Sequence, residues 1–312
     1  MTRKNYVVDL AIADFAAAVL DFRTVFGIDG IPMWEEYEPS GNTWGMHFPV
    51  GGLQAFGLMS PKAQASDRTA MNLADVLATR GEGMTLIGFV APDLAATQAE
   101  LQRAGVTFIT EQPWRVGDEN ITMTEQVHGV TLAFAQHDVG HWERWERGEI
   151  RAQHPIPVPA FPPSLRRRVQ RALSIEIAVH DLDSAAHDFA RALGPARVVP
   201  AAALADGLRG VDFAITGPER IRLVSVQRSA CARAQLVSDY LQRRGEGVVV
   251  MEFLVEDAAR NQAALEAEGI AFIPGAVRRT PTAAYTCTQP IHGLAVEFVQ
   301  NVQGRAAGSA GA

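Results

Sequence analysis

The amino-acid sequence contains an internal repeat, and this feature limits the fold more than any other. The segment Arg80–Gly83 recurs with the same residues at Arg244–Gly247. Downstream of each copy, Thr122–Gly129 is similar to Thr286–Gly293, at the same offset of about 164 residues. Two matching pairs at one offset indicate that the chain consists of two duplicated halves. At 312 residues, each half is long enough to bury a hydrophobic core of its own.

Each half divides again into two segments of the same kind. An apolar run of strand length is followed by a segment of helical period four times, and Gly-rich stretches of β-forming residues follow each helix. An aspartate precedes every predicted helix, where its carboxylate accepts the unpaired N–H groups of the first turn. These aspartates are Asp14, Asp93, Asp181 and Asp257, ahead of helices predicted at 15–26, 94–104, 182–193 and 258–268. The sequence therefore predicts an α+β fold made of four βαβββ modules.

Proline interrupts this rhythm between the two halves. His154-Pro155, Pro157, Pro159 and Pro162-Pro163 fall in a segment that carries neither period, which favours an extended connection. We therefore predict an N-terminal domain at 1–138, a Pro-rich linker at 139–172 and a C-terminal domain at 173–302. The Gly- and Ala-rich end at 303–312 is predicted to be a disordered tail.

Composition excludes several classes of partner. The net charge of −7 comes without a long block of like charge, since the longest basic run is Arg166–Arg168, and nucleic acid binding requires a basic face. No apolar stretch approaches the roughly 20 residues that span a bilayer, and no signal peptide is recognisable at the start. Cys231 and Cys287 lie far apart and are expected to be reduced thiols. We expect a cytoplasmic protein whose partner is a small molecule, while the sequence leaves monomer and homodimer open.

The repeated motifs contain turn residues. Arg80–Gly83 and Arg244–Gly247 lead into strands and not into helices, so their glycines are predicted to form turns and not phosphate-binding loops. His128 and His292 each precede a glycine, and we expect both in tight turns at the protein surface.

Taken together, these segments resemble the vicinal-oxygen-chelate superfamily, which includes glyoxalase I, extradiol dioxygenases, methylmalonyl-CoA epimerase and bleomycin resistance proteins. The residues that carry the resemblance are the strand ending at Asp14, the segment Arg80–Gly83 ahead of Asp93, and the closing runs 128–136 and 292–300. The resemblance covers nearly the whole chain outside the linker and tail. It implies two tandem glyoxalase-like domains, each with a curved mixed β-sheet around a cavity that holds a divalent metal.

The family's metal ligands are mostly missing from this sequence. In the family, the first-strand ligand, usually His, lies seven residues before the capping aspartate, and the last-strand ligand is usually Glu. The corresponding positions here are Val7, Leu86, Ser174 and Val250 on first strands, and Gly57, Ala133, Arg222 and Glu297 on last strands. Glu297 alone fits the pattern, and one carboxylate does not hold a metal that needs three or more protein ligands. We therefore predict no cofactor and no metal site, with an atypical divalent-metal site as an alternative.

Acidic side chains replace the missing ligands. Residues five before each capping aspartate face the same side of the sheet as the lost ligand, because alternate residues of a strand share a face. They are Asp9, Gly88, Glu176 and Glu252. Glu176, Glu252 and Glu297 are predicted to point into the C-terminal cavity, where neighbouring carboxyl groups share a proton and act as catalytic acids or bases. The alternatives are a register that turns some of them to solvent, and neutralisation by Arg222 or another Arg in structural ion pairs.

Four further residues are candidates for binding a substrate. Asp9, Trp44 and His47 are predicted on strands that border the N-terminal cavity, and Asp212 is the repeat equivalent of His47. Tyr285 begins a strand that is predicted to line the C-terminal cavity, where its hydroxyl can donate to a substrate oxygen. A structural role is the alternative for His47 and for Tyr285.

Three functions are compatible with these residues. The first is a lyase or isomerase that acts on a small oxygenated or aromatic metabolite through the carboxyl groups of the C-terminal cavity. The second is a metal-free protein that binds or sequesters a small molecule, with Trp44 offering a ring face to a cation. The third is a dioxygenase-like enzyme in which oxygen ligands from Glu176, Glu252 and Glu297 hold a divalent metal.

Overall fold

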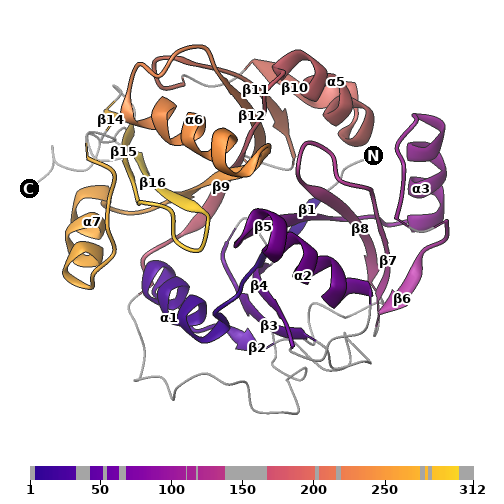
Figure 1. The fold of residues 1–312 in the computed structure, drawn as a ribbon, viewed down its shortest axis with the longest axis horizontal. Coiled ribbons are helices and arrows are strands. Elements are labelled where there is room, and N and C mark those ends of the chain that lie inside the picture. The colour runs from indigo at the N-terminus through magenta and orange to yellow at the C-terminus, as the bar shows by residue number, and fades with distance from the viewer. Residues whose placement is uncertain are drawn as a thin grey trace, which may run out of the picture.

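The computed structural model describes residues 4–32, 43–51, 55–62, 68–109, 111–116, 119–137, 167–200, 204–215, 219–274, 278–279 and 283–301. Most of the predicted linker and the whole predicted tail at 303–312 lie outside these residues. The two halves of the chain each form one sheet with its own helices, and the halves lie side by side (Figure 1).

The N-terminal half alternates strands and helices in the predicted order. Its elements are β1 (Lys4–Ala11), α1 (Phe15–Phe26), β2 (Ile31–Pro32), β3 (Thr43–Phe48), β4 (Ala55–Pro61), α2 (Arg68–Arg80), β5 (Gly83–Val90), α3 (Leu94–Arg103), β6 (Trp114–Val116), β7 (Glu119–Met123) and β8 (Thr131–His137). The strands form a mixed sheet in the order β2-β3-β4-β1-β5-β8-β7-β6. Strand β1 lies at its centre, parallel to β4 and antiparallel to β5.

The C-terminal half repeats this arrangement. Its elements are β9 (Arg171–Ala178), α5 (Leu182–Leu193), the short 3-10 helix η1 (Pro195–Arg197), β10 (Val198–Pro200), β11 (Leu208–Ala214), β12 (Arg220–Val226), α6 (Ala232–Arg244), β13 (Gly247–Leu254), α7 (Ala258–Ala267), β14 (Arg278–Arg279), β15 (Ala283–Cys287) and β16 (Ala295–Asn301). The strand order is β10-β11-β12-β9-β13-β16-β15-β14, equivalent strand for strand to the first sheet. Four βαβββ modules are present, which confirms the predicted fold.

The helix starts are built as the sequence predicts. Asp14, Asp93, Asp181 and Asp257 are the N-caps of α1, α3, α5 and α7, and each side chain accepts a hydrogen bond from a backbone N–H of the first turn. These four helices pack on one face of their sheets. The buried residues on that face form a single core that runs through both halves, which we call the shared core. Phe26 of α1 contacts Phe253 of β13 across the halves, with ring centroids 5.2 Å apart.

Helices α2 and α6 are additions that the sequence reasoning did not predict. Each connects two modules of one half, and each lies across one sheet (Figure 1). Helix α6 packs Leu236, Val237 and Tyr240 against the face of the C-terminal sheet that is opposite to the shared core, which we call the α6 face. In the N-terminal half, Leu73 of α2 packs against the equivalent face, the α2 face. Helices therefore cover both faces of each sheet.

The repeated motifs meet where the halves contact each other. The His292 ring lies between Glu82 and Asp21 of the other half, with Nδ1 2.7 Å from Glu82 Oε2 and Nε2 3.0 Å from Asp21 Oδ2. The His128 ring makes the equivalent contacts of 2.7 Å to Glu246 and 3.1 Å to Asp188. Both histidines occupy turns with positive φ, as predicted. Their surface placement was wrong, because their side chains are only 14% and 11% exposed between the halves.

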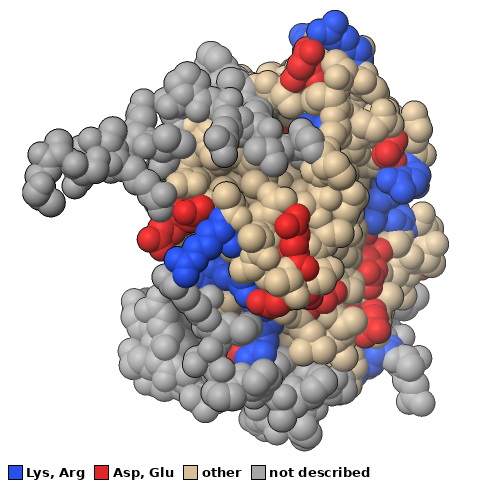
Figure 2. Space-filling view, turned by 90° about the vertical axis from the view of Figure 1, so that its left-hand side faces the viewer, with Lys and Arg blue, Asp and Glu red and all other residues tan. Residues whose placement is uncertain are grey.

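The outer surface carries charges of both signs. On the face in Figure 2, basic and acidic side chains of the described residues are interspersed, and neither sign covers the face alone. Among the described helices, none is long and apolar enough to cross a membrane.

Candidate functional site

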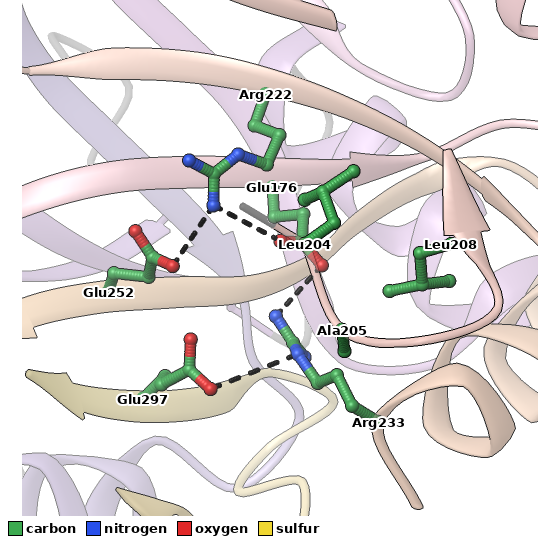
Figure 3. Close-up of a pocket in the computed structure, with 8 residues that line it drawn as sticks. All are labelled: Glu176, Leu204, Ala205, Leu208, Arg222, Arg233, Glu252 and Glu297. Carbon is green, nitrogen blue, oxygen red and sulfur yellow. Dashed lines mark hydrogen bonds and ion pairs between the residues drawn. The ribbon is translucent and has the colours of Figure 1, made fainter. Parts of the chain in front are cut away.

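A group of charged side chains lies between the C-terminal sheet and α6. Glu176 comes from β9, Glu252 from β13 and Glu297 from β16, and these strands are neighbours in the sheet. Glu252 and Glu297 occupy paired positions on parallel strands. The three side chains are 2%, 6% and 3% exposed, so the structure brings together the acids that the sequence predicts to point inward (Figure 3).

The guanidinium of Arg222 lies among these acids. It makes two hydrogen bonds to Asp212, from Nε to Oδ1 at 2.7 Å and from Nη2 to Oδ2 at 3.2 Å. Its Nη1 donates to Glu252 Oε1 at 3.1 Å and lies 3.9 Å from Glu176 Oε2. Register explains this arrangement, because Arg222 on β12 is paired with Glu176 on one side and Asp212 on the other. A buried carboxylate is costly without such partners.

A second guanidinium enters from the opposite side. Arg233 lies in the first turn of α6, and its Nη2 donates to Glu176 Oε1 at 2.8 Å. Its Nε lies 4.0 Å from Glu297 Oε1. Arg233 is 7% exposed, so both arginines are enclosed with the acids (Figure 3). Arg220 adds a third positive charge at the rim, 3.9 Å from Asp212 and 37% exposed.

The pKa of Glu252 depends on the polar groups around its buried carboxyl group. Burial raises the pKa of Glu252, but the charge of Arg222 and hydrogen bonds from Ser174 and Glu297 outweigh it, so this pKa is lowered. The lowered pKa favours the carboxylate form of Glu252.

These side chains border a small pocket. Its cavity volume is only about 10 Å³, and its lining residues are Glu176, Leu204, Ala205, Leu208, Arg222, Arg233, Glu252 and Glu297 (Figure 3). Leu204 and Ala205 precede β11 and Leu208 is its first residue, and these three residues form the apolar part of the lining. The pocket combines an apolar side with acid, carboxylate and guanidinium groups. Such a combination suits a ligand of few atoms with polar groups at one end.

The residues of this site do not fit the divalent metal that the fold family implies. At the ligand positions of the C-terminal half, Ser174 donates a hydrogen bond to Glu252, Val250 is apolar and Arg222 is a cation. The Arg222 guanidinium occupies the space between the acids, where a metal ion would meet like charge. Among the described residues, no three His, Cys, Asp or Glu side chains are arranged to hold a metal ion.

The α2 face of the N-terminal half is less charged at the equivalent positions. Gly57, Gly88 and Ala133 stand where the C-terminal half has Arg222, Glu252 and Glu297. Asp9 and His47 remain, and His47 Nε2 lies 3.8 Å from Asp9 Oδ1. A Cβ added to Gly57 would lie 1.9 Å from Asp9 Oδ1, so the glycine makes room for the acid. The N-terminal half therefore has one acid and one histidine on this face, whereas the C-terminal half has four acids and two arginines.

Trp44 and Tyr285 do not join these groups. Trp44 packs against the shared core with Met46 and Phe48, which is the face opposite to His47, so its predicted place beside the N-terminal cavity was wrong. Lys62 Nζ lies 4.2 Å from the centroid of its ring. Tyr285 is half-buried on β15, on the same strand face as Cys287, but it is outside the residues that line the pocket.

The sequence reasoning missed the residue that closes the site. Arg233 lies on α6, which was not predicted. The helical spacing of Leu236, Val237, Tyr240 and Leu241 was the available signal, since these residues repeat at intervals of three and four. The sequence gives Arg222 only as an alternative, in structural ion pairs, and it is the residue that contacts three of the four acids.

Comparisons with known proteins identify the fold. No protein-family model matches the chain, and no curated protein matches it. Among solved structures, a mutant of 4-hydroxymandelate synthase from Streptomyces coelicolor is similar, with a TM-score of 0.65 and 13% identity over 96% of this chain and 93% of that one. The Mn(II)-bound glyoxalase from Novosphingobium aromaticivorans has a TM-score of 0.57 and 11% identity over 96% and 83% of the two chains.

A fusion of a xylose isomerase-like TIM barrel with a 4-hydroxyphenylpyruvate dioxygenase is also similar. Its TM-score is 0.63 at 12% identity, over all of this chain and 50% of that one. These neighbours are vicinal-oxygen-chelate proteins. The chain has the fold of that superfamily, with four modules in two tandem halves, as the sequence indicated.

Proposed function

We propose that the protein is an enzyme that moves a proton on a small oxygenated metabolite, as a lyase or an isomerase, in the pocket beneath α6. The observation that carries this proposal is the pair of Glu252 and Glu297, which are buried side by side on paired strands. In the proposed reaction Glu252 is the carboxylate and Glu297 the carboxylic acid, so that one site supplies a base and an acid at the same pH.

The two carboxyl groups have distinct roles in the proposed reaction. The Glu252 carboxylate takes a proton from a substrate carbon next to a carbonyl group, and the electron pair of the C–H bond moves toward the carbonyl oxygen, which forms an enolate. The Glu297 carboxyl group delivers a proton to the substrate, either back to carbon or to a leaving group. Glu176 and Asp212 hold the two arginines in place and do not take part in the transfer.

The structural neighbours support an enzyme of small molecules in general terms. Those named above are a synthase, a dioxygenase fusion and a glyoxalase. The glyoxalase carries Mn(II), whereas the acids here are bridged by Arg222, so the proposed reaction uses only side chains of this protein.

Proton exchange with solvent tests this function. The protein is incubated in D₂O with a panel of small carbonyl compounds, and deuterium incorporation at carbon is followed by NMR. We expect incorporation with at least one compound, and a loss of roughly 10²–10⁴-fold in Glu252→Gln and in Glu297→Gln. Glu256→Gln, at an exposed residue just after β13, is the matched control and should retain the wild-type rate. Equal rates in wild type and both site variants would exclude the proposed roles.

A second candidate is a protein that binds the same compounds without reacting. The observation that favours it is the extent of pairing in the site, since Arg222 bonds Asp212 and Glu252 while Arg233 bonds Glu176. Ligand-observed NMR in the same samples separates the two candidates. Binding without deuterium incorporation across the panel supports the binding protein and refutes the enzyme.

A further inference from the structure

We infer that Arg233 is the residue that binds and polarises the substrate oxygen, so that the pocket takes a small carbonyl compound whose oxygen accepts a hydrogen bond from Nη1. This inference rests on the proposed function, which it deepens by naming the oxygen-binding residue and the substrate class. In this site a guanidinium group polarises the substrate oxygen, since the side chains do not fit a metal ion that could do so.

The first support is an unused hydrogen-bond donor on a side chain that lines the pocket. Among the described residues, Arg233 Nη1 is buried and has no hydrogen-bond partner, whereas Nη2 of the same guanidinium is bonded to Glu176. Arg233 as a whole is only 7% exposed, and it lines the pocket. A buried N–H of a charged group without a partner is costly, so a ligand oxygen at this place gains more than it would in water.

The second support is the position of Arg233 relative to the proton-transfer pair. Its Nε lies 4.0 Å from Glu297 Oε1, and Glu297 is paired in the sheet with Glu252. A carbonyl oxygen at Nη1 therefore has its neighbouring carbon within the same small pocket as the two carboxyl groups. When the C–H bond breaks, negative charge moves to that oxygen, and a fixed guanidinium in a buried site stabilises it.

The third support is a difference between the two arginines. Arg222 has hydrogen bonds to Asp212 and Glu252 and serves the acids, whereas Arg233 comes from α6 on the other side of the pocket. The sheet thus supplies the groups that exchange protons, and the helix supplies the group that binds oxygen. The equivalent position in the sequence of α2 is Thr69, which carries no charge.

Acetohydroxamate tests the inference by binding alone. It is a small planar compound with two oxygens, is neutral at pH 7 and resembles an enol at a carbonyl carbon. Its binding to EDTA-treated protein is measured by ligand-observed NMR, with propylammonium as a probe that lacks an oxygen acceptor. We expect acetohydroxamate to bind the wild type and to bind Arg233→Ala at least tenfold more weakly. We expect propylammonium not to bind either protein.

Added guanidinium separates a chemical role from a structural one. At concentrations well below those that unfold the protein, guanidinium chloride is expected to restore acetohydroxamate binding to Arg233→Ala, and urea at the same concentration is not. Arg233→Ala leaves the buried Glu176 carboxylate without Arg233 and could destabilise the protein. The double variant Arg233→Ala/Glu176→Gln removes that charge and provides a second test of binding. Arg228→Ala, at an exposed arginine paired with Asp206, is the control and should bind like the wild type.

The outcomes are distinct. Failure of acetohydroxamate to bind the wild type, or equal binding to wild type and to both Arg233 variants, overturns the inference. Binding that follows Arg233 and returns with guanidinium supports it, even if no compound exchanges protons and the proposed enzymatic function fails. Where exchange is observed, removal of Arg233 should reduce its rate by roughly 10²–10³-fold, as for other donors to a developing oxyanion.

Discussion

Replacement of Arg222 by Gln should be among the most destabilising single substitutions in the C-terminal half. The side chain is 5% exposed and makes three hydrogen bonds of 2.7–3.2 Å to Asp212 and Glu252. Its loss leaves both carboxylates enclosed without their guanidinium partner, although Ser174 and Glu297 still act on Glu252 and Arg220 lies 3.9 Å from Asp212. Removal of one partner from a buried ion pair costs about 3–5 kcal/mol, and we expect Arg222→Gln to fall in this range.

The loss of stability in Arg222→Gln should depend on pH, because the ion pair of Arg222 with Glu252 forms only when Glu252 is ionised. Arg222 lowers the pKa of Glu252 below its ordinary value of 4.5, so this carboxylate stabilises the fold above pH 4.5 and the contribution is lost as the pH falls through the lowered value. Without Arg222 the contribution is smaller, because Arg222 is the strongest of the groups that lower this pKa. The difference between variant and wild type should therefore be largest at neutral pH and shrink below about pH 4.5.

Urea denaturation at several pH values measures both quantities. The double variant Arg222→Gln/Asp212→Asn should be more stable than the single variant, because it leaves one enclosed carboxylate fewer. Arg228→Gln, which removes an exposed ion pair with Asp206, should be indistinguishable from the wild type. A single variant within 1 kcal/mol of the wild type at pH 7, or a double variant less stable than the single one, would refute this account of the buried charges.

Three other substitutions or conditions have expected outcomes. Burial raises the pKa of Glu82, but hydrogen bonds from the backbone and from His292 lower it overall. The free energy of unfolding, measured by urea titration, should therefore fall on acidification below about pH 4.5, and it should fall less steeply in Glu82→Gln. Gly57→Ala places a methyl group 1.9 Å from Asp9 Oδ1 and should cost roughly 1–3 kcal/mol, a loss that Asp9→Ala relieves; additive losses would contradict this. Burial raises the pKa of Cys287 to about 12, so a thiol reagent should label Cys231 alone in native protein, and rapid labelling of both would be the contrary result.

Local rules were sufficient to predict much of the fold. An aspartate before an amphipathic segment identifies a helix start, and all four predicted N-caps accept the expected hydrogen bonds. Two-residue periodicity also placed Glu176 and Glu252 on the face that forms the pocket. The same rule places Trp44 and His47 on opposite faces of β3, because three positions separate them, and only His47 lies on the face of Asp9.

Contacts between distant segments were beyond such rules. The glycine after His292 indicates a turn, but nothing near it in the sequence indicates Glu82 and Asp21 as partners. The same is true of Arg233, whose helix crosses the sheet only because the two modules on either side of it pair. A site that combines a sheet with an inserted helix therefore has a predictable half and an unpredictable half.

The reciprocal contacts of His128 and His292 explain which segments of the two halves still have the same sequence. In an isologous contact, each motif faces a copy of the surface that its own half presents, so a change in one copy disturbs a contact that the other copy also makes. Arg80–Gly83 and Arg244–Gly247 lie at this contact and are identical, whereas the covered faces of the two sheets have diverged to Gly88 in one half and Glu252 in the other. Symmetry has thus preserved the joint between the halves and left each of them free to acquire its own chemistry.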